Sequence, residues 1–356
     1  MPDTIRKAQE EREHSYLSPY AAFSDCSLGR DVPETPCDIR TIYQQDRDRI
    51  IHSKAFRRLN GKTQVFLTPM GDHYRTRMTH TLEVAQIART IAKALRLNED
   101  LTEAIALGHD LGHTPFGHAG ERALNDACAA GFAHHEQSLR VVEILSNKNG
   151  KTMNLTREVR DGILNHQTEG MPHTLEGKVV RLSDKIAYIN HDIDDAIRGH
   201  IITEDDIPYE YTSVLGHSSG ERLNTIVHDI VTSSTDQPDI IMTPKVLDAM
   251  TGLRNYMFQS VYTNPLAKGQ EKKAERLIRE LFQYYVEHAD VLPEEFINQI
   301  EKGDGKCYNE IHLYSDNELR RLRTERAVCD YIAGMTDRYA VSKFHEIMIP
   351  TGWDVY

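Results

Sequence analysis

Six side chains able to bind a metal or a phosphate are concentrated in two short stretches, RMTHTLEVAQIART and IALGHDLGHTPFGH. They are Arg77, His80, His109, Asp110, His113 and His118. A single histidine is most simply explained as a core imidazole hydrogen-bonded to the backbone. Several imidazoles beside a carboxylate are costly inside apolar helices unless an ion compensates them. The density of this cluster therefore favours a bound metal or anion.

The first stretch is expected to form a helix with His80 on its buried side. Its apolar face consists of Val84, Ile87, Ala88, Ile91 and Leu95, which recur at helical spacing. His80 precedes Val84 by four residues and so lies on the same face. We therefore expect the His80 imidazole to point into the protein.

A second helix is expected to begin after Asn98, whose side chain can cap it. His109 follows the apolar Ile105 by four residues, and Asp110 is its immediate neighbour. Adjacent side chains on a helix diverge by about 100°, so this pair can share an ion only if the ion lies between them. The glycines and proline of residues 112–117 then end the helix and begin a loop with two further histidines.

A fourth metal ligand is expected from the later stretch VVRLSDKIAYINHDIDDAI. One helical face of this stretch contains Val180, Asp184, Ala187, Tyr188 and His191. An unpaired aspartate on such a face would be expensive to desolvate, although Lys185 beside it could neutralise it. The complete set favours a metal instead: His80, His109, Asp110 and Asp184. Two imidazoles and two carboxylates suit a divalent Mn, Fe, Mg, Co or Ni better than a closed structural zinc site.

These motifs resemble the H…HD…D signature of the HD phosphohydrolase superfamily, and in finer detail its dGTPase-like branch, the deoxynucleoside triphosphate triphosphohydrolases. The resemblance extends over most of the chain, through SPYA, RDRIIHSKAFRRLNGKTQVF, HHEQSLRV, SVYTNP and DYIAGMTDRYA. It implies an all-α HD-domain fold with minor short strands, a homo-oligomer and a divalent metal cofactor. The implied activity is hydrolysis of a dNTP to deoxynucleoside and inorganic triphosphate, which would control dNTP pools.

The resemblance also implies roles for individual residues. The metal ligands would be the four residues above, and the catalytic group would be His113, His118 and Glu121. Substrate would be bound by Gln64, Arg77, Lys185, Tyr188, Asp192, Arg254 and Tyr262. Relatives have a single histidine near the motif HHEQ, so either His134 or His135 could face the substrate.

Composition narrows the cellular setting and the partners. The 356 residues carry a formal net charge of −12 with a pI of about 5.8, so no global basic field attracts nucleic acid or anionic membrane. No apolar run approaches the roughly 20 residues of a transmembrane helix. The five cysteines form no CxxC motif, as expected for reduced thiols in a cytoplasmic protein.

The chain is expected to divide into an irregular N-terminal arm (1–40), an HD core (41–290) and a C-terminal helical extension packed on the core (291–356). Short strands are possible at 62–66 and within 231–244, residues 294–316 read as an exposed excursion, and 317–335 as the last helix. The first core helix contains Arg47, Arg49, Arg57 and Arg58. They form either a solvated face or the edge of an anion site or subunit contact.

Three other functions stay open from the sequence. The first is another HD phosphohydrolase reaction, such as a deoxynucleoside 5′-monophosphatase or a cyclic or alarmone nucleotide hydrolase. The second is a non-catalytic nucleotide-binding regulator, against which the retained His118 and Glu121 argue. The third is a nucleic-acid-binding module, which the acidic pI disfavours.

Overall fold

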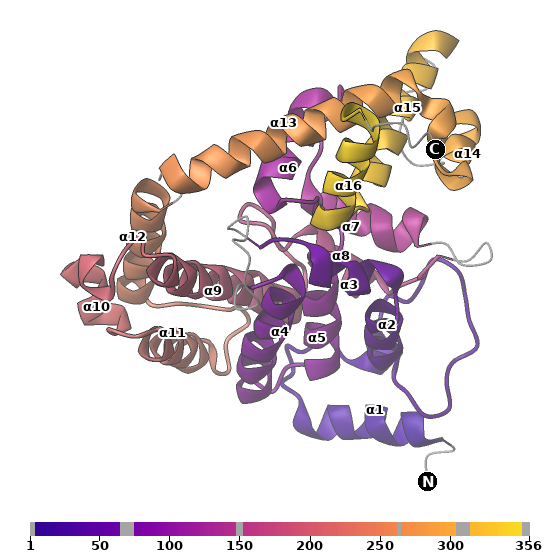
Figure 1. Ribbon diagram of the computed structural model, residues 1–356. Helices are drawn as coiled ribbons and strands as arrows, with labels where there is room; N and C mark the ends of the chain where they lie inside the picture. The colour runs from indigo at the N-terminus through magenta and orange to yellow at the C-terminus, as the bar shows by residue number, and fades with distance from the viewer. Residues whose placement is uncertain (1–3, 65–74, 147–151, 262–264, 304–313, 351–356) are drawn as a thin grey trace, which may run out of the picture.

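A computed structural model describes residues 4–64, 75–146, 152–261, 265–303 and 314–350, and Figure 1 shows the arrangement of their helices. The prediction of an all-α fold is confirmed, since the only strand pairing among these residues is an isolated bridge between Thr63 and Thr76. The α-helices are α1 (Ile5–Tyr16), α2 (Ile42–Ile51), α3 (Lys54–Arg58), α4 (Arg77–Ala94), α5 (Glu99–Gly108), α6 (Gly117–Ala127), α7 (His134–Arg140), α8 (Arg157–Leu164), α9 (Leu175–Arg198), α10 (Tyr209–Leu215), α11 (Ser219–Ser234), α12 (Pro244–Ser260), α13 (Pro265–Glu287), α14 (Glu294–Lys302), α15 (Asp316–Ala333) and α16 (Asp337–Met348).

The larger of two hydrophobic clusters holds together the helices that carry the metal motifs. Helix α4 packs against α5 and α9, and α5 also packs against α2 and α8. The α5–α8 contact requires glycine on both helices. A Cβ at Gly108 would lie 2.6 Å from Ile163, and one at Gly162 would lie 2.6 Å from Ile105. This close packing fixes the end of α5, directly before His109.

The second hydrophobic cluster joins α6 to the C-terminal part of the chain. Its fully buried members include Leu124 of α6, Ile278 of α13 and Val328 of α15. The long helix α13 crosses the top of the molecule in Figure 1 and packs against both α6 and α15. The helix that follows the HD motif therefore packs with the C-terminal helices, in the second cluster.

The structure corrects three expectations from the sequence. The N-terminal segment is not wholly irregular, because α1 lies within it, capped by Thr4. Helix α14 occupies part of the expected exposed excursion, and α16 follows the helix that was expected to be last. A polar helix such as α1, whose only buried residue is Glu10, has no apolar periodicity for a sequence pattern to detect. The possible strand at 62–66 extends beyond the described residues, and 231–244 contains none.

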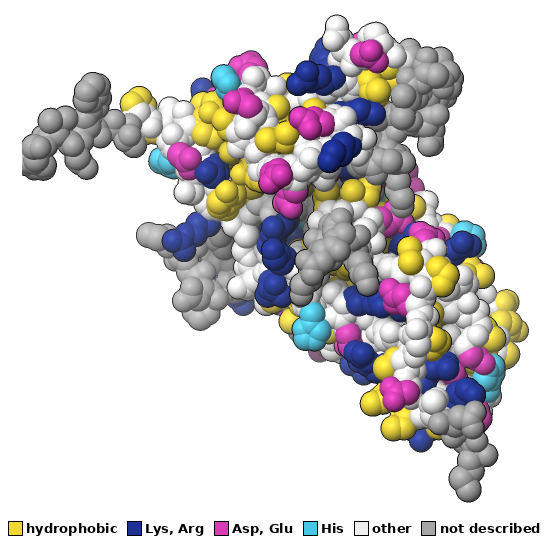
Figure 2. Space-filling view, turned by 90° about the vertical axis from the view of Figure 1, so that its right-hand side faces the viewer, with side chains coloured by type: hydrophobic (Ala, Val, Ile, Leu, Met, Phe, Trp, Pro, Cys, Tyr) yellow, Lys and Arg dark blue, Asp and Glu magenta, His cyan; other side chains and the backbone are white. Residues whose placement is uncertain are grey.

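The surface is mixed in charge, as Figure 2 shows for one face, with basic side chains gathered near its centre. No helix within the described parts of the chain is both long and apolar enough to cross a membrane.

Candidate metal centre and active site

Three helices bring the four candidate metal ligands together. His80 lies in the first turn of α4, His109 ends α5, Asp110 follows it, and Asp184 lies in α9. His80 Nε2 is 3.0 Å from Asp184 Oδ1. His109 Nε2 is 3.8 Å from the same oxygen and 3.6 Å from Asp110 Oδ1. The donor atoms of all four residues therefore face one small volume.

The hydrogen bonding of His109 fits a cation in this volume. Its Nδ1 donates to the Ala106 carbonyl at 2.7 Å, so the proton is on Nδ1 and the lone pair is on Nε2. That Nε2 is buried and has no hydrogen-bond partner among the described residues. A buried lone pair that faces two carboxylate oxygens costs free energy, which a divalent metal would recover.

Both carboxylates are ionised, as metal ligands must be. Burial opposes the charge on Asp110, but the neighbouring Arg77 guanidinium outweighs burial and holds the pKa of Asp110 well below the usual range. Burial likewise opposes the charge on Asp184, whose pKa is nevertheless lowered by the hydrogen bond from His80. Arg77 is almost fully buried, and its Nη1 donates to Asp110 Oδ2 at 2.5 Å. Asp110 Oδ1 is thus left to face the histidines.

A second group of hydrogen-bonded histidine and glutamate side chains lies next to the candidate metal ligands, and such groups can transfer protons. His118 and Glu121 lie one turn apart in α6, and His118 Nδ1 donates to Glu121 Oε2 at 3.0 Å. Glu121 Oε1 accepts from both the backbone N–H and Nδ1 of His134, each at 2.8 Å. These hydrogen bonds outweigh burial and lower the pKa of Glu121. The His118 side chain is 61% exposed, so its other ring nitrogen can reach a substrate.

His134 also contacts His166, which was not among the predicted site residues. His166 donates from Nδ1 to the Ile163 carbonyl at 2.7 Å, so its Nε2 accepts from His134 Nε2 at 3.2 Å. His134 therefore carries protons on both nitrogens. Burial disfavours that charge, but Glu121 outweighs burial and raises the pKa of His134. Of the two candidates, His134 is the one that faces Glu121.

His113 connects the metal ligands to the proton-transfer group. Its Nε2 is 3.7 Å from Asp110 Oδ1, while its ring stacks on His134 with centroids 4.2 Å apart. Burial, together with the charges of Arg77 and His134, lowers the pKa of His113, so the ring is neutral. Its Nδ1 is buried without a hydrogen-bond partner among the described residues. A neutral ring with an open nitrogen can contact a phosphate placed between the two groups.

The remaining expected substrate residues lie mainly along α9. Lys185 is half-buried, and burial and Arg181 lower its pKa to about 8. Burial raises the pKa of the Tyr188 phenol, which Arg254 of α12 contacts. Burial and Asp195 raise the pKa of Asp192.

Gln64 is buried, and its backbone carbonyl accepts a hydrogen bond from Arg77 Nη2 at 3.2 Å. Tyr262 lies outside the described residues.

Two buried histidines near the metal ligands were not predicted as site residues. The ring of His166 is 5.0 Å from that of His109, and the ring of His191 is 5.8 Å from that of His80. His191 occurs on the Asp184 face in the sequence, so its position was visible there. His166 follows the apolar face of α8 by one turn, after Ile163, which was the available signal for its burial.

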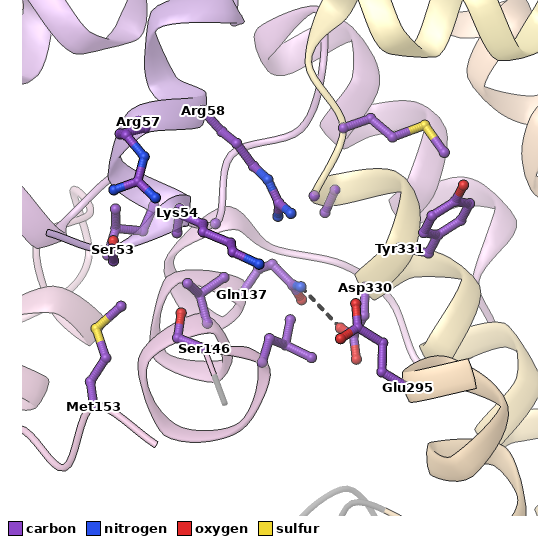
Figure 3. Close-up of a pocket in the computed structure, with 18 of the residues that line it drawn as sticks. Ser53, Lys54, Arg57, Arg58, Gln137, Ser146, Met153, Glu295, Asp330 and Tyr331 are labelled. Atoms are coloured by element: carbon purple, nitrogen blue, oxygen red, sulfur yellow. Dashed lines mark hydrogen bonds between the residues drawn. The ribbon is translucent and has the colours of Figure 1, made fainter. Parts of the chain in front are cut away.

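A separate cavity of about 1070 Å³ lies between α3 and the C-terminal helices, and Leu111 and Gly112, which follow the HD motif, form part of its wall. Figure 3 shows Lys54, Arg57 and Arg58 on one wall, opposite Asp330 and Glu295. Of the four arginines of the first core segment, Arg49, Arg57 and Arg58 line this cavity, and Arg49 pairs there with Glu34. Arg47 lies outside it and donates to Asp100 at 2.7 Å.

Comparison with known proteins agrees with this geometry. An HD domain model matches residues 77–189, and a phosphohydrolase-associated domain model matches residues 240–346. The chain is 56% identical over 349 residues to a deoxyguanosinetriphosphate triphosphohydrolase-like protein of Caldanaerobacter subterraneus subsp. tengcongensis, covering 98% of this chain and 97% of the other. Proteins with the same description from Desulfatibacillum aliphaticivorans and Clostridium perfringens are 48% and 47% identical, covering 98% and 97% of this chain and 99% and 98% of theirs. Similarity at this level over nearly the whole length shows that the chain belongs to the deoxyguanosinetriphosphate triphosphohydrolase-like family of HD-domain proteins.

Proposed function

We propose that this protein hydrolyses deoxynucleoside triphosphates to deoxynucleoside and inorganic triphosphate, and that it needs a divalent metal to do so. The observation that supports this most is the position of His113, which contacts Asp110, one of the four candidate metal ligands, and also the rings of His118 and His134. A phosphate at this position would lie between a cation site and a proton donor. Hydrolysis of a phosphate ester requires both.

His80, His109, Asp110 and Asp184 would hold the metal. Bound there, a divalent ion such as Mn²⁺ or Mg²⁺ supplies a Lewis acid that neutralises charge developing on the reacting phosphoryl group. Around it, the protein provides its own positive charge, from Arg77 and Lys185. An acidic chain must concentrate such charge locally to attract a polyphosphate.

His118 would supply the proton for the leaving group. When water adds to the α-phosphorus, it loses a proton to the solvent, the bond from phosphorus to O5′ breaks, and O5′ must gain a proton to leave as a hydroxyl. His118 can give that proton from Nε2, because its Nδ1–H is held by Glu121. The carboxylate stabilises the doubly protonated ring before transfer and fixes its orientation. The products are then a deoxynucleoside and an intact triphosphate.

Selection for deoxyribose would come from α9. Tyr188 and Asp192 follow Asp184 by one and two helical turns, about 6 and 12 Å along a straight helix. That is about the distance across a sugar whose α-phosphate is next to Asp184. The Tyr188 ring would cover the C2′ edge, where a ribose hydroxyl would lose water without gaining a partner. Asp192 would contact the 3′-hydroxyl.

The test is a panel of the four dNTPs, incubated with the purified protein and either Mn²⁺ or Mg²⁺, with the products separated by ion exchange. Equal amounts of deoxynucleoside and tripolyphosphate are expected, and Asp110→Ala should release neither. Release of orthophosphate from deoxynucleoside monophosphates, without tripolyphosphate from any dNTP, would instead show a monophosphatase. Absence of turnover with any nucleotide would leave only nucleotide binding.

A further inference from the structure

Three backbone and side-chain donors from two separate segments converge on one carboxylate of the C-terminal extension. Asp337 is the first residue of α16. Its Oδ1 accepts from the Phe116 N–H at 2.9 Å. Its Oδ2 accepts from the Thr63 N–H at 2.9 Å and from the Thr63 hydroxyl at 2.5 Å. One side chain thus joins the start of α16 to two segments that are more than 200 residues away in the sequence.

Both of these segments border the proposed active site. Phe116 lies two residues before His118 and directly precedes α6. Thr63 precedes Gln64, whose carbonyl accepts from Arg77. The Lys62 carbonyl also accepts from the Arg77 N–H at 3.1 Å, at the start of α4. Asp337 therefore holds the backbone on either side of the volume that a phosphate would occupy.

The backbone before His118 has an unfavourable conformation that must be stabilised by its surroundings. Phe116 has a φ of +62° and Gly117 a φ of +57°, so two consecutive residues are left-handed. This conformation is uncommon for a residue with a bulky side chain and persists only where the surroundings impose it. Only glycine fits at position 117 without a shift, since a Cβ there would lie 2.9 Å from the Gln64 carbonyl oxygen. The hydrogen bond to Asp337 fixes the Phe116 peptide at this point.

A buried lysine provides a matching link at the other end of the loop. Lys62 is 2% exposed, and its Nζ donates to the His113 carbonyl and, at 2.7 Å, to the Ala333 carbonyl at the end of α15. Contact between the two segments is direct, since a Cβ at Gly61 would lie 2.8 Å from Thr336. The turn between α15 and α16 is thus joined to both His113 and Phe116.

We propose that Asp337 is a positioning residue for His118, so that the C-terminal extension completes the active site of the HD core. The proposal rests on the function proposed above, in which His118 donates a proton. Asp337 does not touch the substrate. It holds the left-handed turn that sets where α6 begins and therefore where the His118 ring stands relative to the phosphate.

Asp337→Ala should lower kcat by about 10- to 100-fold, because small misplacements of a catalytic group have effects of this size. Bound metal, measured by elemental analysis, should stay as in the unmodified enzyme, since the proposed metal ligands are on other elements, and KM should change less than kcat. Asp337→Asn should lose less activity than Asp337→Ala, because its one amide oxygen can accept from either the Phe116 N–H or the Thr63 N–H but not from both. The control is Asp316→Ala, which removes the first residue of α15, an exposed aspartate that likewise follows a helix N-cap. A kcat for Asp337→Ala equal to that of the control would overturn the proposal.

Two further measurements separate positioning from general loss of structure. In a His118→Ala background, Asp337→Ala should cause little additional loss, because both changes affect the same step. A full additional loss would show that Asp337 acts elsewhere. Hydrogen–deuterium exchange of peptides covering 113–121 should be faster in Asp337→Ala than in the control, and this readout needs no turnover. Unchanged exchange there would refute the positioning role even if the protein hydrolysed no dNTP, whereas faster exchange without any dNTP hydrolysis would refute only the proposed function.

Discussion

The most informative perturbation of the proton-transfer group is Glu121→Gln, which changes one atom and removes one charge. Glu121 Oε1 accepts from the backbone N–H of His134, which cannot reverse its polarity. The glutamine must therefore keep its oxygen toward His134 and turn its NH₂ toward His118. Two donors would then meet at His118 Nδ1 unless that nitrogen gave up its proton. The substitution thus excludes the doubly protonated His118 while leaving the shape of the site unchanged.

The expected loss follows from the hydrogen bond that disappears. A hydrogen bond between a charged ring and a carboxylate contributes about 1.5–3 kcal/mol. If that interaction stabilises the proton donor in the transition state, kcat should fall by about 10- to 150-fold. The loss should be smaller than that of His118→Ala, for which about 10²- to 10⁴-fold is expected, because the imidazole is still present.

The assay is steady-state release of tripolyphosphate from the best dNTP, with metal content measured on the same samples. KM and bound metal should change little, since Glu121 contacts neither the four metal ligands nor the α9 residues among the partners the structure shows for it. Glu136→Gln is the matched control, an exposed glutamate in the first turn of α7, next to the same histidines.

Two results would refute this reasoning. One is a kcat for Glu121→Gln within twofold of the control, which would mean that the carboxylate does not support a charged His118. The other is a full additional loss when Glu121→Gln is combined with His118→Ala. Residues that act as a unit lose little more together than the more damaging change alone.

Four other predictions address the rest of the site and the fold. Asp110→Ala and Asp184→Ala should each lose bound metal and activity while circular dichroism shows an unchanged helical content; full metal occupancy in both would contradict the ligand assignment. The kcat/KM for dNTPs should exceed that for NTPs by about 5- to 150-fold, which corresponds to about 1–3 kcal/mol for an unpartnered 2′-hydroxyl, and Tyr188→Ala should reduce this ratio. Equal kcat/KM for dGTP and GTP in the unmodified enzyme would exclude sugar discrimination by Tyr188. The polar N-terminal segment and the arginine-rich α2–α3 segment suggest a homo-oligomer, so light scattering should give a multiple of the 40.7 kDa chain mass, and a fully active monomer at micromolar concentration would be evidence against it. Burial raises the pKa of Glu176, whose Oε1 accepts from the Asn98 and Ala22 N–H groups, so the carboxyl group stabilises the fold most below its unfolded pKa of about 4.3, and this stabilisation falls as pH rises through the higher folded pKa. The Tm of Glu176→Gln minus the Tm of the unmodified protein should therefore be more positive at pH 8 than at pH 4.5. A Tm difference that does not change with pH would contradict this prediction.

The inward direction of the candidate metal ligands could be predicted from the sequence because their environment is periodic. Val84 and Ile105 mark the buried faces of α4 and α5, and both are fully buried in the structure. A residue four positions from either one must share its face, which directs His80 and His109 inward. The same reasoning applies to Asp184 on α9. Local periodicity thus determines which side chains point into the core, and three such helices can meet only in the core.

The links from the C-terminal extension could not be predicted in this way. Asp337 and Phe116 are 221 residues apart, and neither lies on an apolar face that would indicate its partner. The Lys62 amine is buried against two backbone carbonyls, where a sequence pattern suggests an exposed charge. The division into arm, core and extension stays a prediction, but the second hydrophobic cluster shows α6 packed with α13 and α15. Contacts of this kind depend on the tertiary arrangement rather than on local propensity.

The choice between His134 and His135 depends on both local helix geometry and a tertiary contact. Neighbouring residues at a helix start diverge by about 100°, so only one of them can face Glu121. Backbone N–H groups in the first turn of a helix have no partner within the helix and need an acceptor from elsewhere. His134 is the first residue of α7, and its N–H and its Nδ1 both donate to Glu121 Oε1. A helix beginning at His134 therefore satisfies its first N–H and its imidazole with one carboxylate, an arrangement that His135 cannot reproduce. A correct prediction that α7 begins at His134 would therefore have been enough to choose His134 over His135.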